Sequence, residues 1–382
     1  MYKPYAEHLL TLNAEAKYRR LGRVSQDSIK NFLDFSTNDY LALSRNKQVI
    51  EASINASKQY GLGTTGSRLL SGNTPLHEEF EAVIAKDKNT EASLIFNSGF
   101  QANESTLSSL LDEKILKTKP LVFFDKLNHS SLYQAIFLSK PELHRYHHND
   151  MNHLEYLLQE HKNDTRPKFI ITETIFSMDG DIVPLKQIVD LAKHYNAFLY
   201  LDEAHATGML GPKGYGLSTT VDLQEIPHVI MGTFSKALGS SGGYIACHNV
   251  IRNFLINKAP GFIYSTSSSP AVIGGAFKAW KMLENLDTER KKLQELGSLL
   301  RGKLQKLGFD IGNSSSHIVP IILGEEKTCL QAKEALLEEG IIVSAIRPPT
   351  VPPSSSRLRI SLTTEHKVQD IEKLLASLKR VA

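Results

Sequence analysis

Cysteine is scarce in this chain of 382 residues, which contains only Cys247 and Cys329. The two lie far apart and form no CxxC pair, so the sequence excludes a disulfide framework and a thiolate metal site. This cysteine usage is typical of a reducing compartment, and we expect a cytoplasmic protein. No run of about 18 apolar residues occurs, so no membrane-spanning helix is predicted. The first 21 residues lack the apolar core of a signal peptide and predict a charged, amphipathic helix.

The net charge is also small, +3 from 44 basic and 41 acidic side chains. Such a balanced charge offers no basic patch for nucleic acid, although it would not repel a phosphate-bearing substrate. Hydrophobic residues make up 41% of the chain and charged residues 22%, as in ordinary globular proteins. At this length we expect two or three domains.

Short apolar runs alternate with helical patterns between about residues 90 and 250. Several runs are continuously apolar, which is typical of strands buried on both faces of a sheet. The alternation predicts an α/β fold with a mostly parallel central sheet covered by helices. The expected strands are residues 92–96, 121–125, 169–173, 197–202, 228–232 and 244–247, and one clear helix is expected at 184–195.

The pattern changes after about residue 270 and predicts a smaller α+β domain. Charged helices are expected at 288–307 and 329–339, with a last helix at the end of the chain. Strands are expected at 318–323, around 341–343 and at 357–362. The predicted division is therefore an N-terminal arm (1–50), a large domain (51–270) and a small C-terminal domain (271–382).

Three motif matches fail on their context. Residues 61–66 fit G-x-G-x-x-G, but a helical stretch precedes them where a dinucleotide fingerprint needs a strand. Residues 202–205 read Asp-Glu-Ala-His, as in helicases, but the chain has no G-x-x-x-x-G-K-[ST] loop for a nucleotide. The histidines at 144, 147, 148 and 153 show no defined metal-ligand spacing, which favours solvated or structural roles and no metal site.

Lys236 follows the apolar run at 228–232, on a connection rich in Thr, Ser and Gly. A buried ammonium is costly, so Lys236 is either a surface-loop lysine or an amine that forms an imine with a carbonyl. Asp202 ends the most hydrophobic predicted strand. It is either a capping aspartate or a carboxylate that pairs with a pyridinium nitrogen. His205 is either structural or a hydrogen-bond partner of the same ring's phenolic oxygen.

Two further groups follow predicted strands, where open α/β sheets bind ligands. Ser98, Gly99 and Phe100 open a predicted helix, and backbone N–H groups at such a helix start form an anion site. Glycine before a helix is common, so this signal is weak alone. His129 follows the strand that ends at Asp125, and its imidazole is either structural or stacked on an aromatic ring.

Seven segments together resemble the α-oxoamine synthase family of fold-type-I enzymes that use pyridoxal 5'-phosphate (PLP). They occur in the family's order over nearly the whole chain, at residues 35–41, 61–73, 97–100, 173–180, 202–208, 233–239 and 264–266. The resemblance implies the fold-type-I transferase fold, PLP as cofactor, and a homodimer with a shared active site.

The resemblance also implies roles for single residues. Lys236 resembles the Schiff-base lysine and Asp202 the partner of the pyridinium nitrogen, while His205 is expected to bind the ring oxygen and His129 to stack on the ring. The other implied cofactor contacts are Gly99, Phe100, Ser177 and Thr233, with Ser265 or Thr266 given to the phosphate of the neighbouring subunit. The chain departs from the family's frequent residues at Ser235, Ala206 and Tyr215, which bears on packing and rim contacts.

The C-terminal segment narrows the activity that the resemblance implies. Residues 345–352 and 357–361 closely resemble the biotin-pathway branch of the family, which condenses L-alanine with a pimeloyl thioester of coenzyme A or an acyl carrier protein and releases CO2. Arg359 resembles the clamp for the amino-acid carboxylate, a task that suits a planar fork of donors. Asn38, Arg19 and Thr350 are the other expected substrate contacts.

Two alternatives stay open at this point. One is a sibling acyltransferase that uses glycine or another acyl thioester. The other is a catalytically silent partner subunit, as some family heterodimers contain, although such subunits lack the lysine and Lys236 is present here.

Overall fold

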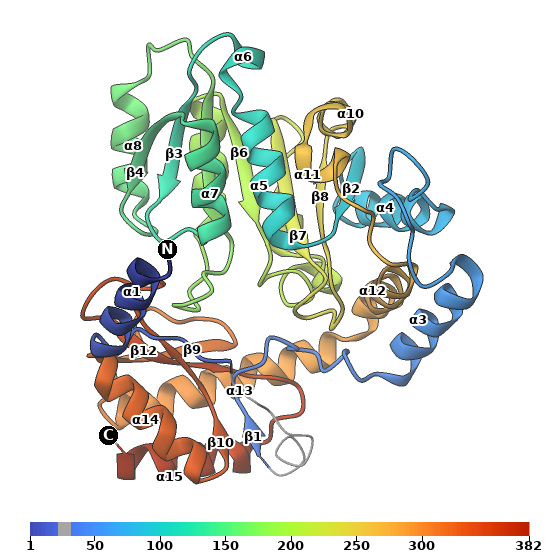
Figure 1. The fold of residues 1–382 in the computed structure, drawn as a ribbon. Helices are drawn as coiled ribbons and strands as arrows, with labels where there is room; N and C mark the ends of the chain where they lie inside the picture. Colours follow the sequence, from blue (N-terminus) through green and yellow to red (C-terminus); the bar gives the residue numbers. More distant parts are fainter. Residues whose placement is uncertain (22–31, 382) are drawn as a thin grey trace. The chain divides into compact units, whose positions relative to one another are not determined.

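A computed structural model describes residues 1–21 and 32–381, which form two compact units (Figure 1). The first unit contains residues 1–38, 177–181 and 291–382, and the second contains residues 39–176 and 182–290. Each unit is built from segments distant in the chain. Of the predicted arm, residues 1–38 belong to the first unit and residues 39–50 to the second.

The second unit is built around a sheet of seven strands among its described residues. Their order is β2-β8-β7-β6-β5-β3-β4, and every pairing is parallel except those of β8 with β2 and β7. Six strands therefore run in one direction, and their carboxyl ends lie along one edge. The strands are β2 (Ala92–Phe96), β3 (Leu121–Asp125), β4 (Glu142–Tyr146), β5 (Lys168–Glu173), β6 (Ala197–Asp202), β7 (His228–Thr233) and β8 (Gly243–Cys247).

Helices cover this sheet, and strands β2, β3, β5 and β8 are buried along their whole length. Helix α5 packs against β2, β7 and β8, and α9 packs against β6. The helices of the unit are α3 (Lys47–Tyr60), α4 (Pro75–Asp87), α5 (Gly99–Leu110), α6 (Glu113–Leu116), α7 (Ser130–Ser139), α8 (Met151–Glu160), α9 (Leu185–His194), α10 (Asn249–Lys258), α11 (Pro260–Ile263) and α12 (Pro270–Met282), with short turns η1 (Pro212–Gly214), η2 (Leu217–Thr220) and η3 (Leu283–Asn285).

The first unit carries a smaller antiparallel sheet of β11 (Ser344–Ile346), β12 (Ser356–Ser361) and β9 (Ile318–Gly324), in that order. A separate parallel pair joins β1 (Leu33–Asp34) to β10 (Ile341–Ile342). Beside this pair, the ring of Phe35 stacks on His366 with centroids 4.2 Å apart. The helices of the unit are α1 (Lys3–Ala14), α13 (Asp287–Lys306, whose first residues belong to the second unit), α14 (Glu326–Glu338) and α15 (Val368–Val381).

The predicted fold class is confirmed, because the central sheet is mostly parallel and lies among helices. All six strands expected between residues 90 and 250 are present, to within one residue at each end. Strand β4 was not predicted, because its residues Glu-Leu-His-Arg-Tyr form a polar edge strand with no apolar run. Among the described residues, no helix is both long enough and apolar enough to span a membrane.

Candidate active site

The carboxyl ends of the central strands gather most of the predicted cofactor residues in the second unit. Asp202 is the last residue of β6, and Thr233 is the last residue of the neighbouring β7. Lys236 comes three residues after β7, and the start of α5 follows β2. Parallel pairing brings these ends together because each strand approaches the same edge in the same direction.

Lys236 and His205 form a direct contact at this edge. The Nζ atom of Lys236 lies 2.9 Å from Nε2 of His205. The other ring nitrogen of His205, Nδ1, lies 2.6 Å from the hydroxyl oxygen of Tyr40. Tyr40 is fully buried and His205 nearly so, which holds the imidazole between the phenol and the amine. Of these three residues, Tyr40 was not predicted as a site residue from the sequence.

Asp202 is buried, with 3% of its surface exposed, and each of its carboxylate oxygens accepts a hydrogen bond. The backbone N–H of Ala204 donates to Oδ1 at 2.8 Å, and the side-chain amide of Asn103 donates to Oδ2 at 2.7 Å. Both oxygens are thus held by donors from within the chain. Asn103 is a site residue that the sequence analysis missed.

His129 lies at the N-terminus of α7 and caps that helix. Its Nδ1 accepts a hydrogen bond from the backbone N–H of Ser131 at 3.2 Å and lies 2.8 Å from the hydroxyl oxygen of Ser131. Burial lowers the pKa of the imidazole, and the positive charge of Lys236 lowers it further, although Asp202 opposes them. The ring is therefore held neutral, which suits contact with an aromatic cofactor.

Glu173 ends β5 and is the register partner of Asp202 on β6. Burial raises the pKa of its carboxyl group well above the usual value, and the negative charge of Asp202 raises it further. Two buried carboxyl groups therefore lie at the ends of neighbouring strands. The sequence signalled Glu173 only as part of a segment shared with a family.

The N-terminus of α5 lies close to the end of β7. The hydroxyl of Ser98 accepts the N–H of Gln101 at 3.1 Å and caps the helix. The N–H groups of Gly99 and Phe100 belong to the first turn, where a helix has no carbonyl of its own to receive them. A methyl group on Gly99 would lie only 3.5 Å from Oγ1 of Thr233, so the two elements meet closely.

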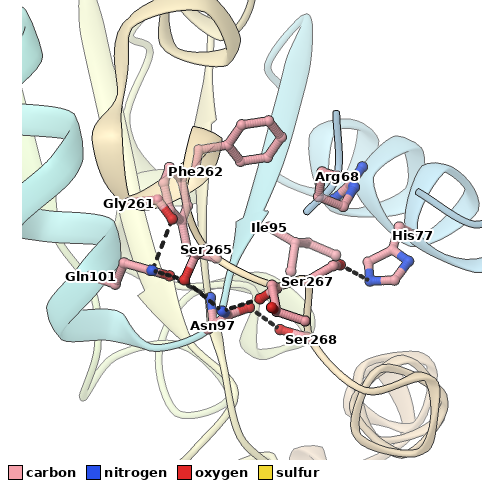
Figure 2. Close-up of a pocket in the computed structure, with 12 residues that line it drawn as sticks. Arg68, His77, Ile95, Asn97, Gln101, Gly261, Phe262, Ser265, Ser267 and Ser268 are labelled. Carbon is pink, nitrogen blue, oxygen red and sulfur yellow. Dashed lines mark hydrogen bonds between the residues drawn. The ribbon is translucent and has the colours of Figure 1, made fainter. Parts of the chain in front are cut away.

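Thr266 lies in a segment that is hydrogen-bonded to the end of β2 and the start of α5. The side chain of Asn97 donates to the backbone oxygen of Thr266 at 2.6 Å and to the hydroxyl of Ser265 at 3.2 Å (Figure 2). Gln101 also donates to the Ser265 hydroxyl, at 3.0 Å. The enclosed space here is about 10 Å³, room for about one water, so these contacts organise the segment rather than a ligand.

Arg359 is the centre of a second group, which lies within the first unit. It is buried on β12, and its Nε donates to the backbone oxygen of Ser177 at 2.6 Å. Its Nη1 donates to Oδ1 of Asn38 at 3.0 Å and to the hydroxyl of Ser361 at 2.7 Å. The structure thus brings together three residues predicted separately, namely Arg359, Asn38 and Ser177. The backbone oxygen of Ser177 orients the arginine.

Arg19 and Thr350 also meet within the first unit, although 331 positions separate them. The Nη2 atom of Arg19 donates to the hydroxyl of Thr350 at 3.0 Å. They line a depression of about 150 Å³ together with Lys17 and Arg347. Three cationic side chains around one small space favour an anionic occupant such as a carboxylate.

The glycine-rich segment at 61–66, the Asp-Glu-Ala-His segment and the histidine-rich stretch make the following structural contacts. Gly61 follows α3 with φ at 87°, so a helix, not a strand, precedes the glycine-rich segment. Glu203 forms a fully buried ion pair with Lys88. In the histidine-rich stretch, His144 lies 3.2 Å from Glu142, and His153 accepts the backbone N–H of His147. Possible ligand atoms come within 4.8 Å of one another in two groups, Glu142, His144 and His161, and His147, Asp150 and His153.

The donor set of the second unit fits PLP. The phosphate of PLP needs N–H and hydroxyl donors, which the start of α5 and the end of β7 supply together. Its ring nitrogen needs a buried carboxylate, which Asp202 supplies, and its aldehyde needs an amine, which Lys236 supplies.

Comparison with known proteins points the same way. The family model described as aminotransferase class I and II matches residues 30–378. A relative from Paramagnetospirillum magneticum, named a putative 8-amino-7-oxononanoate synthase, is 47% identical over 91% of this chain and 88% of its own length.

Solved structures agree with this result. A serine palmitoyltransferase from S. paucimobilis with a bound adduct of PLP and myriocin superposes with a TM-score of 0.89 at 26% identity, covering 100% of this chain and 97% of its own. An 8-amino-7-oxononanoate synthase from Francisella tularensis superposes with a TM-score of 0.79 at 28% identity, covering 92% and 98%.

Proposed function

Because the chain belongs to the aminotransferase class I and II family, in its PLP-dependent α-oxoamine synthase group, we propose that it condenses L-alanine with a pimeloyl thioester. The products are 8-amino-7-oxononanoate, CO2 and the free thiol of the carrier, a step of biotin biosynthesis. One bond forms between Cα of alanine and the acyl carbon. The C–S bond of the thioester and the bond from Cα to the carboxylate break.

The contact between Lys236 and His205 carries this proposal. An amine 2.9 Å from an imidazole, with a buried carboxylate at the end of the neighbouring strand, supports covalent binding of PLP. Lys236 is proposed to hold PLP covalently through Nζ. Thr233 and the N–H groups of Gly99 and Phe100 are proposed to bind the phosphate.

PLP, when bound, supplies a carbonyl for the amino group of alanine and a ring that accepts the electron pair left at Cα. The chain's own residues direct the protons. Lys236 Nζ, once released, takes the proton from Cα, a general-base role worth roughly 10²–10⁴-fold in rate. Asp202 would hold the ring nitrogen, and His205 would hydrogen-bond the ring oxygen. His129 would lie against one face of the ring.

The first unit is proposed to bind the substrates. Arg359 is held by Ser177, Asn38 and Ser361, and a guanidinium is the type of group whose donors a carboxylate accepts in pairs. We assign to it the carboxylate of alanine. The cationic depression with Arg19 and Thr350 suits the acyl substrate, whose pimeloyl chain ends in a second carboxylate.

A homodimer is proposed as the working form, with Thr266 directed to the phosphate of the other subunit. Large apolar side chains are exposed on two segments, one around residues 62–70 and one around residue 264. Hydrogen bonds and a β-bridge between Ser67 and Thr266 join these segments. Leu62 is 79% exposed, and Leu70 and Tyr264 are each 84% exposed. Such a group of large apolar side chains supports a protein–protein interface.

A direct assay tests the proposed reaction. L-alanine, glycine and L-serine are compared with pimeloyl-CoA and with a pimeloyl carrier-protein thioester, while CO2 release and product mass are measured. We expect 8-amino-7-oxononanoate from alanine, at a kcat/KM at least tenfold above those for glycine and serine. Turnover of only serine or glycine would instead favour a sibling acyltransferase, an alternative supported by the TM-score of 0.89 to serine palmitoyltransferase.

A further inference from the structure

Asn103 forms hydrogen bonds to two parts of the site, the Asp202 carboxylate and the Ser131 hydroxyl next to His129. It lies on α5, four residues after Gly99, and is almost fully buried. Its Nδ2 donates to Oδ2 of Asp202 at 2.7 Å and to the hydroxyl oxygen of Ser131 at 2.9 Å. The hydroxyl of Tyr200 donates to its Oδ1 at 2.8 Å. One amide thus connects strand β6 with the helix that His129 caps.

The direction of each hydrogen bond follows from the chemistry of its partners. The carboxylate of Asp202 only accepts, so the amide nitrogen of Asn103 must face it. The second hydrogen of that nitrogen points to the Ser131 oxygen. Ser131 therefore accepts from Asn103, and its own hydroxyl hydrogen is available to Nδ1 of His129, 2.8 Å away.

The backbone N–H of Ser131 also donates to Nδ1 of His129, at 3.2 Å. A ring nitrogen that receives two donors carries no proton of its own, so the proton of the neutral imidazole resides on Nε2. The pKa of His129, lowered by burial and by Lys236, agrees with a neutral ring. The titratable groups around it are Asp202, Lys236 and Glu173.

We propose that Asn103 is a positioning residue that holds the Asp202 carboxylate and, through Ser131, fixes His129 as the Nε2–H tautomer. One side chain thereby positions both Asp202, which is proposed to bind the ring nitrogen of PLP, and His129, which is proposed to contact the ring face. This inference rests on the proposed roles of Asp202 and His129 toward PLP, but it is independent of the acyl substrate. Its test therefore uses cofactor binding and tautomer state.

Asn103→Asp is the most informative variant, because it keeps the shape of the side chain and reverses its hydrogen-bond polarity. A carboxylate at 103 cannot donate to Asp202, repels it, and draws the hydroxyl hydrogen of Ser131 away from His129. We expect the dissociation constant of PLP from the holoenzyme, measured by dialysis and visible absorbance, to rise roughly 10–100-fold. Asn103→Leu, which only deletes the contacts, is expected to weaken binding less than Asn103→Asp.

Two matched variants separate the effect of Asn103 on Asp202 from its effect on His129. Ser131→Ala removes the hydroxyl that accepts from Asn103 and contacts Nδ1 of His129, but it keeps the backbone N–H that donates to Nδ1. It should leave PLP affinity within about threefold, while ¹⁵N spectra of the histidine rings show a reduced population of the Nε2–H tautomer of His129. Tyr200→Phe removes only the contact to Oδ1 of Asn103 and should preserve both readouts within about twofold.

Wild-type PLP affinity and an unchanged His129 spectrum in Asn103→Asp would overturn the proposal, since packing alone would then explain the residue. Equal losses in Tyr200→Phe and Asn103→Asp would also overturn it. Failure of the alanine condensation assay with all these outcomes intact would count against the proposed reaction alone.

Discussion

The Nζ atom of Lys236 lies 2.9 Å from Nε2 of His205, and the opposite nitrogen of that ring lies 2.6 Å from the phenol of Tyr40. The imidazole is thus held from both sides. Residues 31 and 165 positions from it in the chain set its orientation, and one of them is the proposed cofactor-binding lysine. The orientation of its ring is thereby held by contacts within the chain.

Lys236→Ala should abolish the visible absorbance of the covalently bound cofactor and lower kcat by at least about 10³-fold, because both the covalent link and the proposed base are lost. Absorbance spectra and steady-state assays measure this. Lys213→Ala, at an exposed lysine paired with Glu284, serves as the control and should behave as wild type. Retention of the band and of full turnover in Lys236→Ala would exclude this assignment.

Tyr40→Phe should lower kcat about 2–10-fold while PLP stays bound, because one hydrogen bond that orients His205 is lost. Steady-state kinetics and the cofactor's absorbance report the two effects separately. Tyr133→Phe, which removes a hydroxyl bonded to the carbonyl of Lys126, is the matched control. An unchanged kcat in Tyr40→Phe would show that the phenol does not orient the imidazole.

Arg359→Lys should raise KM for L-alanine at least about tenfold, because an ammonium cannot present the planar pair of donors that a carboxylate accepts. Arg357→Lys is the control two positions earlier on β12, where the arginine pairs with Asp179 at 2.5 Å. That variant should lower the melting temperature with little change in KM. The assignment fails if the two variants change KM equally.

Acid should destabilise the protein partly through His77. Burial, with the nearby Arg68 guanidinium, lowers the pKa of His77 to about 4, from 6.5 in the unfolded chain. Between these values the unfolded chain binds a proton that the folded chain does not, so the unfolding free energy falls as the pH falls. From pH 7 to pH 5 this one group contributes a loss of about 2 kcal/mol.

Urea unfolding at the two pH values measures that loss. His77→Gln should reduce the difference between them by about 2 kcal/mol. An equal pH dependence in wild type and His77→Gln would show that His77 titrates normally in the folded chain.

The strands of the central sheet were predictable because they are buried on both faces and so appear as uninterrupted apolar runs. The edge strand β4 was not, because a strand with one open edge can carry Glu142, His144 and Arg145 without cost. The start of α5 was predictable within two residues from Ser98 and Gly99, whose capping role depends on local geometry alone.

The residues of the candidate site also differ in how far the sequence predicts them. Apolar runs in the sequence show where the strands end, and the residues at or shortly after those ends are Lys236, Asp202, His205 and His129. Asn103 and Tyr40 carry no such mark, because a polar residue inside a helix or a loop resembles many others. Their importance lies in hydrogen bonds to residues 99 and 165 positions away.

The sequence by itself therefore determined the fold class, the family and the cofactor, since these depend on hydrophobic periodicity and on the order of short segments. Only the tertiary structure decided which side chains support the site: Tyr40 behind His205, Asn103 between Asp202 and Ser131, and Ser177 behind Arg359. The physical reason is that hydrogen bonds depend on distance and direction between atoms. Spacing along the chain does not specify these until the sheet has brought its strand ends together.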